Sequence, residues 1–217
     1  MQRVFLIASK ATRDLLSKQK VQVEDIGRFY REGRKRAVIY KEIAKHVLKA
    51  TARYSECCYL TGGHPCMMEE PVRQMIALAG RHKIIAKIYP SASFVDGIIA
   101  NMQLSIGHYG YAVMEATKMV ESKIRIDPRV PLFIAQVGAY KQKQALGLSS
   151  REPSDYTTFV TFLRRFYPAN HLIRICDTDP DTGGFVQCEC PVSYFANCAP
   201  FLSYKTTLFV PAREDRS

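Results

Sequence analysis

Short apolar runs alternate with helix-like stretches in the first hundred residues, and this alternation limits the possible folds more than any other feature. The runs at residues 4–7, 57–61 and 83–89 have the length and composition of buried strands. Helix patterns separate them: 34–52 has apolar side chains at three- and four-residue spacing, and 71–81 opens on a proline, which a first helical turn tolerates. Strands alternating with helices predict a parallel sheet with helical crossovers.

The second half has a different pattern. A polar turn at 177–184 joins two strand-like runs, which predicts antiparallel pairing and a mixed sheet. We therefore expect an α/β protein of two domains, with a mostly parallel sheet in residues 1–112 and a mixed sheet in 113–217. The helix expected at 94–104 belongs to the first domain. In the second half we expect strands at 111–115, 132–137, 172–176, 185–190 and 206–210, with a helix at 156–166.

Composition excludes several classes of protein. With 47% hydrophobic and 24% charged residues, the 217-residue chain is typical of a soluble globular protein rather than a disordered one. No apolar run approaches the ~18 residues of a membrane helix, and the N-terminus lacks a signal-peptide cleavage site, so we expect a cytoplasmic protein without a membrane partner. The seven cysteines form no Cys-x-x-Cys pair and have no histidine at zinc-finger spacing, which predicts reduced thiols and no metal site.

Positive charge is concentrated in residues 28–53, which hold nine Lys or Arg against two Glu, in a chain of net charge +11. Such a stretch could contact nucleic acid or an acidic partner. No aromatic platform for stacked bases accompanies it, so a solvated helix face is the favoured interpretation and a nucleic-acid partner is not expected.

Three segments follow expected strands at the position where open α/β sheets bind ligands, beyond the carboxyl ends of the strands. They are 62–65 (Gly-Gly-His-Pro), 90–93 (Pro-Ser-Ala-Ser) and 136–138 (Gln-Val-Gly). Paired glycines allow a ligand close to the backbone, although each segment alone could be a plain turn. Together they favour a cleft between two domains. The dinucleotide and P-loop glycine motifs do not occur, so neither a Rossmann dehydrogenase nor a P-loop NTPase is supported.

In this order, the segments resemble the tetrapyrrole methylase superfamily, and within it the borosin-type peptide backbone N-methyltransferases and their bacterial relatives. The resemblance covers residues 4–211, nearly the whole chain. The stretches that carry it are 63–65, 90–96, Glu115-Ala116-Thr117, 136–138 and 203–211, preceded by a helix entry with Tyr30, Arg36 and Tyr40.

The resemblance implies an S-adenosylmethionine-dependent methyltransferase that acts on a peptide backbone or a small substrate and forms a homodimer. On this basis the catalytic residues are Tyr30, Arg36 and Tyr40, because a guanidinium and phenol hydroxyls could stabilise negative charge on an amide. A peptide substrate is expected to come from a separate chain. The cofactor-binding residues that the resemblance implies are Gly62, Gly63, His64, Pro65, Met67, Ser91, Ala92, Ser93, Gln136, Val137 and Gly138.

The chain also departs from the family pattern. The family's first strand and glycine-rich loop are expected to be missing ahead of Val4, which should leave an unpaired edge in the first sheet. Gly62 stands where the family motif has a tyrosine, and Ser91 where it has a glycine. The alternative hypothesis is therefore a catalytically silent or split-subunit paralogue that acts as a binding or scaffold protein.

Overall fold

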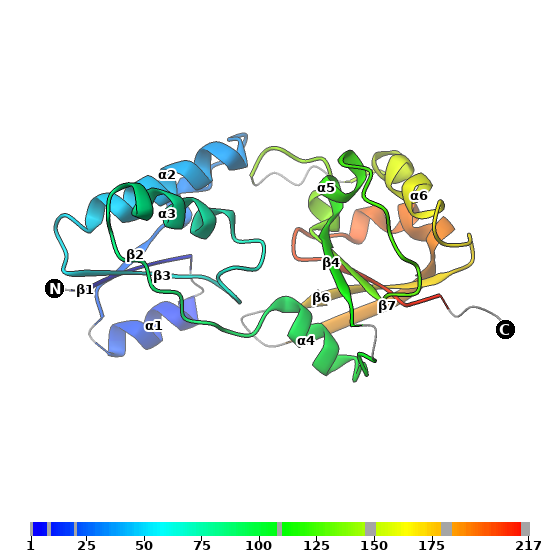
Figure 1. Ribbon diagram of the computed structural model, residues 1–217, viewed down its shortest axis with the longest axis horizontal. Helices are drawn as coiled ribbons and strands as arrows, with labels where there is room; N and C mark the ends of the chain where they lie inside the picture. Colours follow the sequence, from blue (N-terminus) through cyan, green and yellow to red (C-terminus); the bar gives the residue numbers. More distant parts are fainter. Residues whose placement is uncertain are drawn as a thin grey trace. The chain divides into compact units, whose positions relative to one another are not determined.

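The chain packs into two compact units in a computed structural model that describes residues 2–7, 10–19, 21–107, 110–145, 151–178 and 184–213 (Figure 1). One unit comprises Met1–Phe94 with Lys143–Gly147, and the other comprises Val95–Gln142 with Leu148–Ser217. The expected domain boundary at residue 112 does not coincide with the boundary between these two packed units. It stays a prediction.

The first unit contains a parallel sheet of three strands. β1 (Gln2–Leu6) lies between β2 (Val23–Asp25) and β3 (Glu56–Leu60), with Val4 opposite both Val23 and Cys58. The connection from β1 to β2 and the connection from β2 to β3 run in opposite directions along the sheet. Because parallel crossovers are right-handed, their helices cover opposite faces of the sheet.

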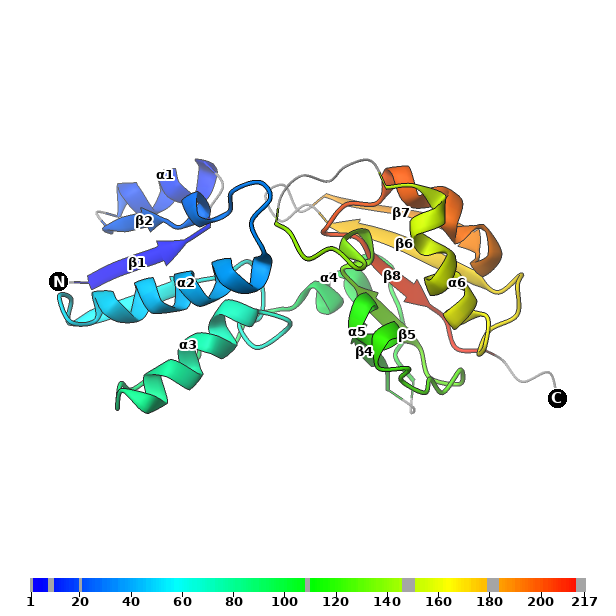
Figure 2. The ribbon, with the colours of Figure 1, turned by 90° about the horizontal axis from the view of Figure 1, so that it is seen from above.

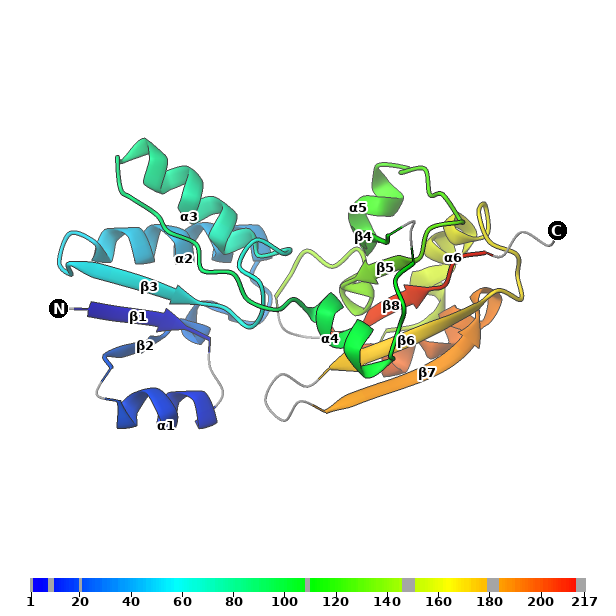
Figure 3. The ribbon, with the colours of Figure 1, turned by 60° about the horizontal axis from the view of Figure 1, so that its bottom comes forward.

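The helices of the first unit follow this rule. Figures 1 and 3 show α1 (Lys10–Lys18) on one side of the sheet, with α2 (Arg36–Ala50) and α3 (Glu70–Arg81) on the other. The turn η1 (Gly27–Phe29) lies between β2 and α2. The buried positions of α2 repeat at three- and four-residue spacing, and they form the core of this unit with Phe5, Ile26 and Met75. These α2 positions are Ile39, Ile43, Ala44 and Val47.

The prediction of a strand at 83–89 is wrong. This segment belongs to none of the described strands, and Ile85 is 96% exposed. A strand exists only when a neighbour satisfies its backbone groups. Among the strands that the structure describes, β3 pairs with β1 alone, so apolar composition at 83–89 did not suffice to form a strand.

The second unit contains a mixed sheet of five strands in the order β4-β5-β8-β6-β7. β4 and β5 are parallel, and every other neighbouring pair is antiparallel. The described part of the turn expected at 177–184 is Asp177, Thr178 and Gly184, and residues 179–183 lie outside the described residues. The strands are β4 (Ala112–Glu115), β5 (Leu132–Ala135), β6 (Leu172–Thr178), β7 (Phe185–Pro191) and β8 (Thr207–Val210).

Helices of the second unit build a large core on this sheet (Figure 2). α5 (Ala116–Glu121), α6 (Thr157–Leu163) and the long 3-10 helix η4 (Val192–Phe201) all contribute buried side chains to it. α4 (Phe94–Asn101) precedes β4, and the short turns η2 (Val137–Ala139) and η3 (Pro153–Tyr156) complete the described elements. Over the described ranges, no helix has the length and hydrophobicity that a bilayer span requires.

Candidate active site

Three tyrosines meet at the border of the first unit's core. Tyr30 follows η1, Tyr40 lies on α2, and Tyr59 lies on β3. The rings of Tyr30 and Tyr40 have centroids 6.3 Å apart in an edge-to-face arrangement, and all three tyrosines pack against the core while staying partly exposed. We call Tyr30, Tyr40 and Tyr59 the tyrosine cluster.

Arg36 lies one helical turn before Tyr40, on the same face of α2. Its side chain forms a hydrogen bond with the Tyr40 phenol, and its charge acts on Tyr30 as well. The Arg36 backbone N–H donates to the carbonyl of Lys143 at 2.8 Å, which anchors the start of α2. The structure therefore brings together Tyr30, Arg36 and Tyr40, the three residues expected to be catalytic.

Two further groups join this site that the sequence did not indicate. Side chains along a strand alternate between its two faces. Tyr59 lies on the more buried face of β3, which packs against the core that α2 helps to form. Glu69 is the residue before α3, and its half-buried carboxylate acts on all three phenols. The alternation in 57–61 could have pointed to Tyr59, whereas no pattern marks Glu69.

Burial raises the pKa of all three phenols in the tyrosine cluster. For Tyr30 and Tyr59, burial and then neighbouring negative charge raise the pKa well above its ordinary value. The pKa of Tyr40 is also raised by burial, although the charge and hydrogen bond of Arg36 oppose the shift. At neutral pH the cluster therefore presents neutral phenols, which donate hydrogen bonds, beside one guanidinium cation.

The loop after β3 has the open backbone that a bound ligand needs. A Cβ on Gly62 would have no atom within 4 Å, and Gly63 has a φ of +120°, a conformation that favours glycine. A Cβ on Gly63 would lie 3.7 Å from the carbonyl oxygen of Ala92, so the segments 62–65 and 90–93 are neighbours in the first unit. Ser91 and Ala92 are exposed, and Ser93 precedes α4.

His64 and Met67 shape this loop. The Cys66 N–H donates to Nδ1 of His64 at 3.1 Å, and the Met67 N–H donates to the His64 carbonyl at 3.0 Å. With Nδ1 accepting, a neutral His64 carries its hydrogen on Nε2. The loop residues, Pro65 included, are at least partly accessible, so this segment suits contacts through backbone groups and small side chains.

The segment 136–138 lies in the second unit, and the structure gives two of its residues a packing role. A Cβ on Gly138 would lie 2.0 Å from the Ser203 carbonyl oxygen, so the close approach of two backbones requires glycine there. Val137 is fully buried, its N–H donates to the Thr206 carbonyl, and its carbonyl accepts from the Tyr156 hydroxyl at 2.8 Å. Gln136 follows β5 and has left-handed backbone angles. Cofactor binding by these three residues stays a prediction.

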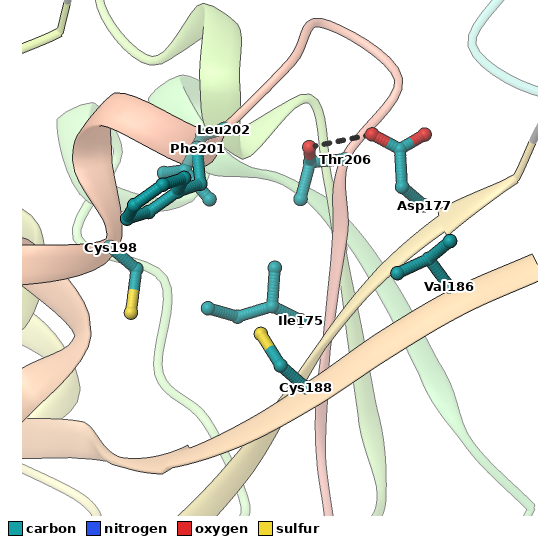
Figure 4. Close-up of a pocket in the computed structure, with 8 residues that line it drawn as sticks. All are labelled: Ile175, Asp177, Val186, Cys188, Cys198, Phe201, Leu202 and Thr206. Carbon is teal, nitrogen blue, oxygen red and sulfur yellow. Dashed lines mark hydrogen bonds between the residues drawn. The ribbon is translucent and has the colours of Figure 1, made fainter.

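A separate open pocket of about 180 Å³ lies beside β6, β7 and η4 in the second unit (Figure 4). Its one carboxylate, Asp177, already accepts hydrogen bonds from Ser203 at 2.7 Å and Thr206 at 3.3 Å. None of the expected site residues lines it. The lining is Ile175, Asp177, Val186, Cys188, Cys198, Phe201, Leu202 and Thr206.

Part of the basic stretch at 28–53 makes internal ion pairs. Arg28 and His46 both bond to Glu24 at 2.6 Å, and Arg34 donates to Glu42 at 2.7 Å. The Glu24 contacts tie η1 and α2 to β2, and the Arg34–Glu42 pair lies at the start of α2. These contacts agree with a structural role for several of the charges.

Known proteins resemble this chain in sequence and fold. The family model of Tetrapyrrole (Corrin/Porphyrin) Methylases matches residues 2–136. A methyltransferase and ribosomally synthesized type I borosin cyclic peptide precursor from Mycena rosella is 27% identical over 115 residues, which are 53% of this chain and 29% of that protein. The chain spans between 16% and 40% of the length of the curated relatives it matches.

Solved structures agree with this assignment. The native form of uroporphyrin III C-methyl transferase from Thermus thermophilus has a TM-score of 0.62 at 11% identity, covering 97% of this chain and 80% of that one. A complex of that transferase with S-adenyl homocysteine has a TM-score of 0.57 at 13% identity, covering 96% and 97%. At these identities the likeness shows the fold, and it confirms the expected α/β architecture with a parallel and a mixed sheet. Since the family model covers more than half of its residues, the chain belongs to the tetrapyrrole methylase family.

Proposed function

We propose that this protein transfers a methyl group from S-adenosylmethionine to a backbone amide nitrogen of a peptide. The observation that supports this most is the site of Arg36 and the tyrosine cluster, which places one fixed cation and neutral phenols together. The family and the similarity to a borosin precursor support the same chemistry.

An amide nitrogen is a poor nucleophile because its lone pair is delocalised onto the carbonyl oxygen. As the nitrogen becomes nucleophilic, negative charge develops on the nitrogen and oxygen of the amide. Arg36 and the Tyr40 hydroxyl stabilise that charge, since both are donors already held in place by their mutual hydrogen bond. Tyr30 adds a second phenol on the same side of α2.

The loops at 62–65 and 90–93 fit S-adenosylmethionine, which supplies an electrophilic methyl group on a sulfonium when bound. Gly62 and Gly63 leave space for a ligand against the backbone, and Ser91 to Ser93 offer amides and hydroxyls nearby. Met67 completes this set at the end of the His64 turn. We propose a homodimer as the working form, as the family resemblance implies.

The cofactor part of the proposal is tested by thermal melting with and without S-adenosylhomocysteine. At a hundred times its dissociation constant, a bound ligand stabilises by about 2.7 kcal/mol. For a chain of this size that raises the melting temperature by roughly 5–10 °C. A cooperative melt with no shift would reject cofactor binding and favour the silent-paralogue alternative.

The acceptor part is tested with tritiated S-adenosylmethionine and a pool of end-capped peptides of Gly, Ala, Val and Pro. These side chains carry no nucleophile, so tritium in the peptides reports transfer to backbone nitrogen. Arg36→Ala should lower the transfer by about 10²–10³-fold. Lys41→Ala, which removes an exposed cation on the same helix, should leave the transfer unchanged. Equal transfer by both variants would contradict the assigned site.

A further inference from the structure

Three cysteines of the second unit lie beside the open pocket shown in Figure 4. Cys188 and Cys190 lie two residues apart on β7 and so share one face of that strand, whereas Cys198 lies on η4. The Sγ atoms of Cys190 and Cys198 are 4.0 Å apart, and the Cys198 thiol donates a weak hydrogen bond across this gap. Both are free thiols, and the proposed methyl transfer uses neither of them.

The gap between these two sulfurs is within reach of a covalent bond. A disulfide bond is about 2.05 Å long, so the sulfurs must approach each other by roughly 2 Å. Rotation of a cysteine side chain between its staggered positions moves the sulfur by more than this distance without moving the backbone. β7 and η4 share one packed core, in which Cys190 is buried and against which Cys198 packs. The fold of a single unit therefore holds the pair together.

The two thiols of the pair differ in their access to solvent. Cys198 lines the open pocket together with Cys188, and Figure 4 shows these two side chains coming from η4 and β7. Cys190 is not part of the pocket lining and is only 7% exposed. Burial raises the pKa of the Cys190 thiol, and the neighbouring thiols add to this effect. A small reagent that enters the pocket therefore reaches Cys198 before Cys190.

We infer that Cys198 and Cys190 are a site of reversible thiol oxidation, at which a hydroperoxide converts the pair to a disulfide. The Cys198 sulfur loses its proton and attacks one peroxide oxygen. The O–O bond breaks, which leaves a sulfenic acid on Cys198 and releases the other oxygen as water or an alcohol. The Cys190 sulfur then attacks the Cys198 sulfur, the S–O bond breaks, and the hydroxyl leaves as water with the Cys190 proton. The two sulfurs together lose two electrons, which reduce the peroxide.

Peptide mapping of the whole chain tests this reaction and needs no methyl acceptor. The folded chain is treated with hydrogen peroxide and then unfolded in the presence of N-ethylmaleimide, which labels every remaining thiol. Trypsin with a glutamate-specific protease gives the peptides 175–189 and 190–205, because Glu189 is a cleavage site between them. The second peptide holds both cysteines of the pair. It should carry no label and be lighter by two hydrogen atoms, and reduction with dithiothreitol before labelling should restore both labels.

Three variants and one internal control identify the role of each thiol. Cys190→Ala removes the second thiol, so the sulfenic acid on Cys198 should accumulate and be trapped by dimedone. Cys198→Ala should leave Cys190 labelled, and Cys188→Ala should leave the disulfide unchanged. Cys57 and Cys58 are the internal control, since adjacent residues of β3 direct their side chains to opposite faces of the strand. These two cysteines should not be joined by the same treatment.

The wild-type peptide map decides the outcome, whether or not each variant folds. A disulfide within 190–205 that dithiothreitol removes supports the inference. A disulfide that joins 175–189 to 190–205 assigns the reaction to a different cysteine and overturns it, as does loss of the bond in Cys188→Ala. Full labelling of 190–205 after peroxide treatment, or a sulfinic acid on Cys198 beside a labelled Cys190, also overturns it.

Discussion

The two compact units use the same residue type in opposite ways. In the second unit, Tyr140 and Tyr156 are fully buried and stack with ring centroids 5.8 Å apart. In the first unit, Tyr30 and Tyr40 stay partly exposed at the border of the core. Burial in an apolar core makes a tyrosine part of the packing, whereas a partly open phenol beside a guanidinium can act on a ligand.

The largest expected effect breaks the packing of the second unit. Phe159→Ala removes a fully buried ring that contacts Tyr140 and Phe195, each at a centroid distance of 5.3 Å. We expect a loss of about 3–5 kcal/mol in the free energy of unfolding, measured by urea denaturation. Tyr40→Phe in the first unit should change stability far less, and similar losses would contradict the contrast between the two units.

Removal of the cation from the first unit should affect catalysis instead of folding. Arg36→Ala is expected to lower methyl transfer by about 10²–10³-fold, the typical cost of losing one charge-stabilising donor. Arg36→Lys keeps the charge but loses the planar guanidinium, so it should recover the rate only in part. Full recovery would show that charge alone suffices. Tritium transfer to the capped peptides measures the rates of the wild type, Arg36→Ala and Arg36→Lys.

An ion-pair network should link the stability of the first unit to pH. Glu24 accepts from Arg3 at 3.2 Å and from Arg28 and His46 at 2.6 Å. Burial opposes its ionisation, but the hydrogen bonds from His46 and Arg3 outweigh burial and lower the pKa. Its stabilisation is therefore complete above the ordinary glutamate pKa and disappears as pH falls through the lowered value.

Glu24→Gln should cost about 1.5–3 kcal/mol at pH 7, since a carboxylate with charged donors is lost. The difference in stability between Glu24→Gln and the wild type should shrink in acid. Thermal melts between pH 3 and pH 7 would measure this change. Glu121→Gln, in an exposed pair with Lys118 at 2.9 Å in the second unit, is the control with little effect. A cost that is independent of pH would contradict the ionised state of Glu24.

Gly138 in the second unit and Gly62 in the first differ in the space around them. Gly138→Ala places a Cβ against the Ser203 backbone and should destabilise the second unit by about 1–3 kcal/mol. Gly62→Ala meets no atom within 4 Å, so stability should hold while the affinity for S-adenosylhomocysteine falls. Melting temperatures and calorimetric titration measure the two effects. Unchanged affinity in Gly62→Ala would argue against the loop as cofactor site.

The smallest effect concerns the segment that failed to form a strand. Ile85 is 96% exposed, so Ile85→Ser should change the free energy of unfolding by less than about 0.5 kcal/mol. A large loss, read from the same urea curves, would show that Ile85 is buried in solution against a second chain. A concentration-dependent melt would then identify that contact.

Local patterns predicted much of this fold. The spacing of Tyr40, Ile43 and Val47 predicted α2, and apolar runs predicted β3 and β5. The prediction at 83–89 failed because a strand forms only beside a neighbouring strand, and the composition of a segment does not indicate whether such a neighbour exists. We expected neither α1 nor β2 nor η4 from sequence patterns. β2 has only three residues, and η4 is a 3-10 helix that includes Pro200.

The site was partly predictable for the same reason. Arg36 and Tyr40 lie four residues apart on one helix, so their proximity follows from helix geometry. Tyr59 and Glu69 join them only through the packing of β3 and α3 against α2, which depends on contacts distant in sequence. Gly138 was expected to serve a cofactor, and its closeness to Ser203 became visible only in the structure.

The proposed methylation of a backbone amide by the first unit's site can be measured by mass spectrometry of the capped peptides. After incubation with S-adenosylmethionine, fragmentation should locate a methyl group on a backbone nitrogen with the wild-type chain and none with Arg36→Ala. Unmodified peptides, from a chain that binds S-adenosylhomocysteine, would contradict it.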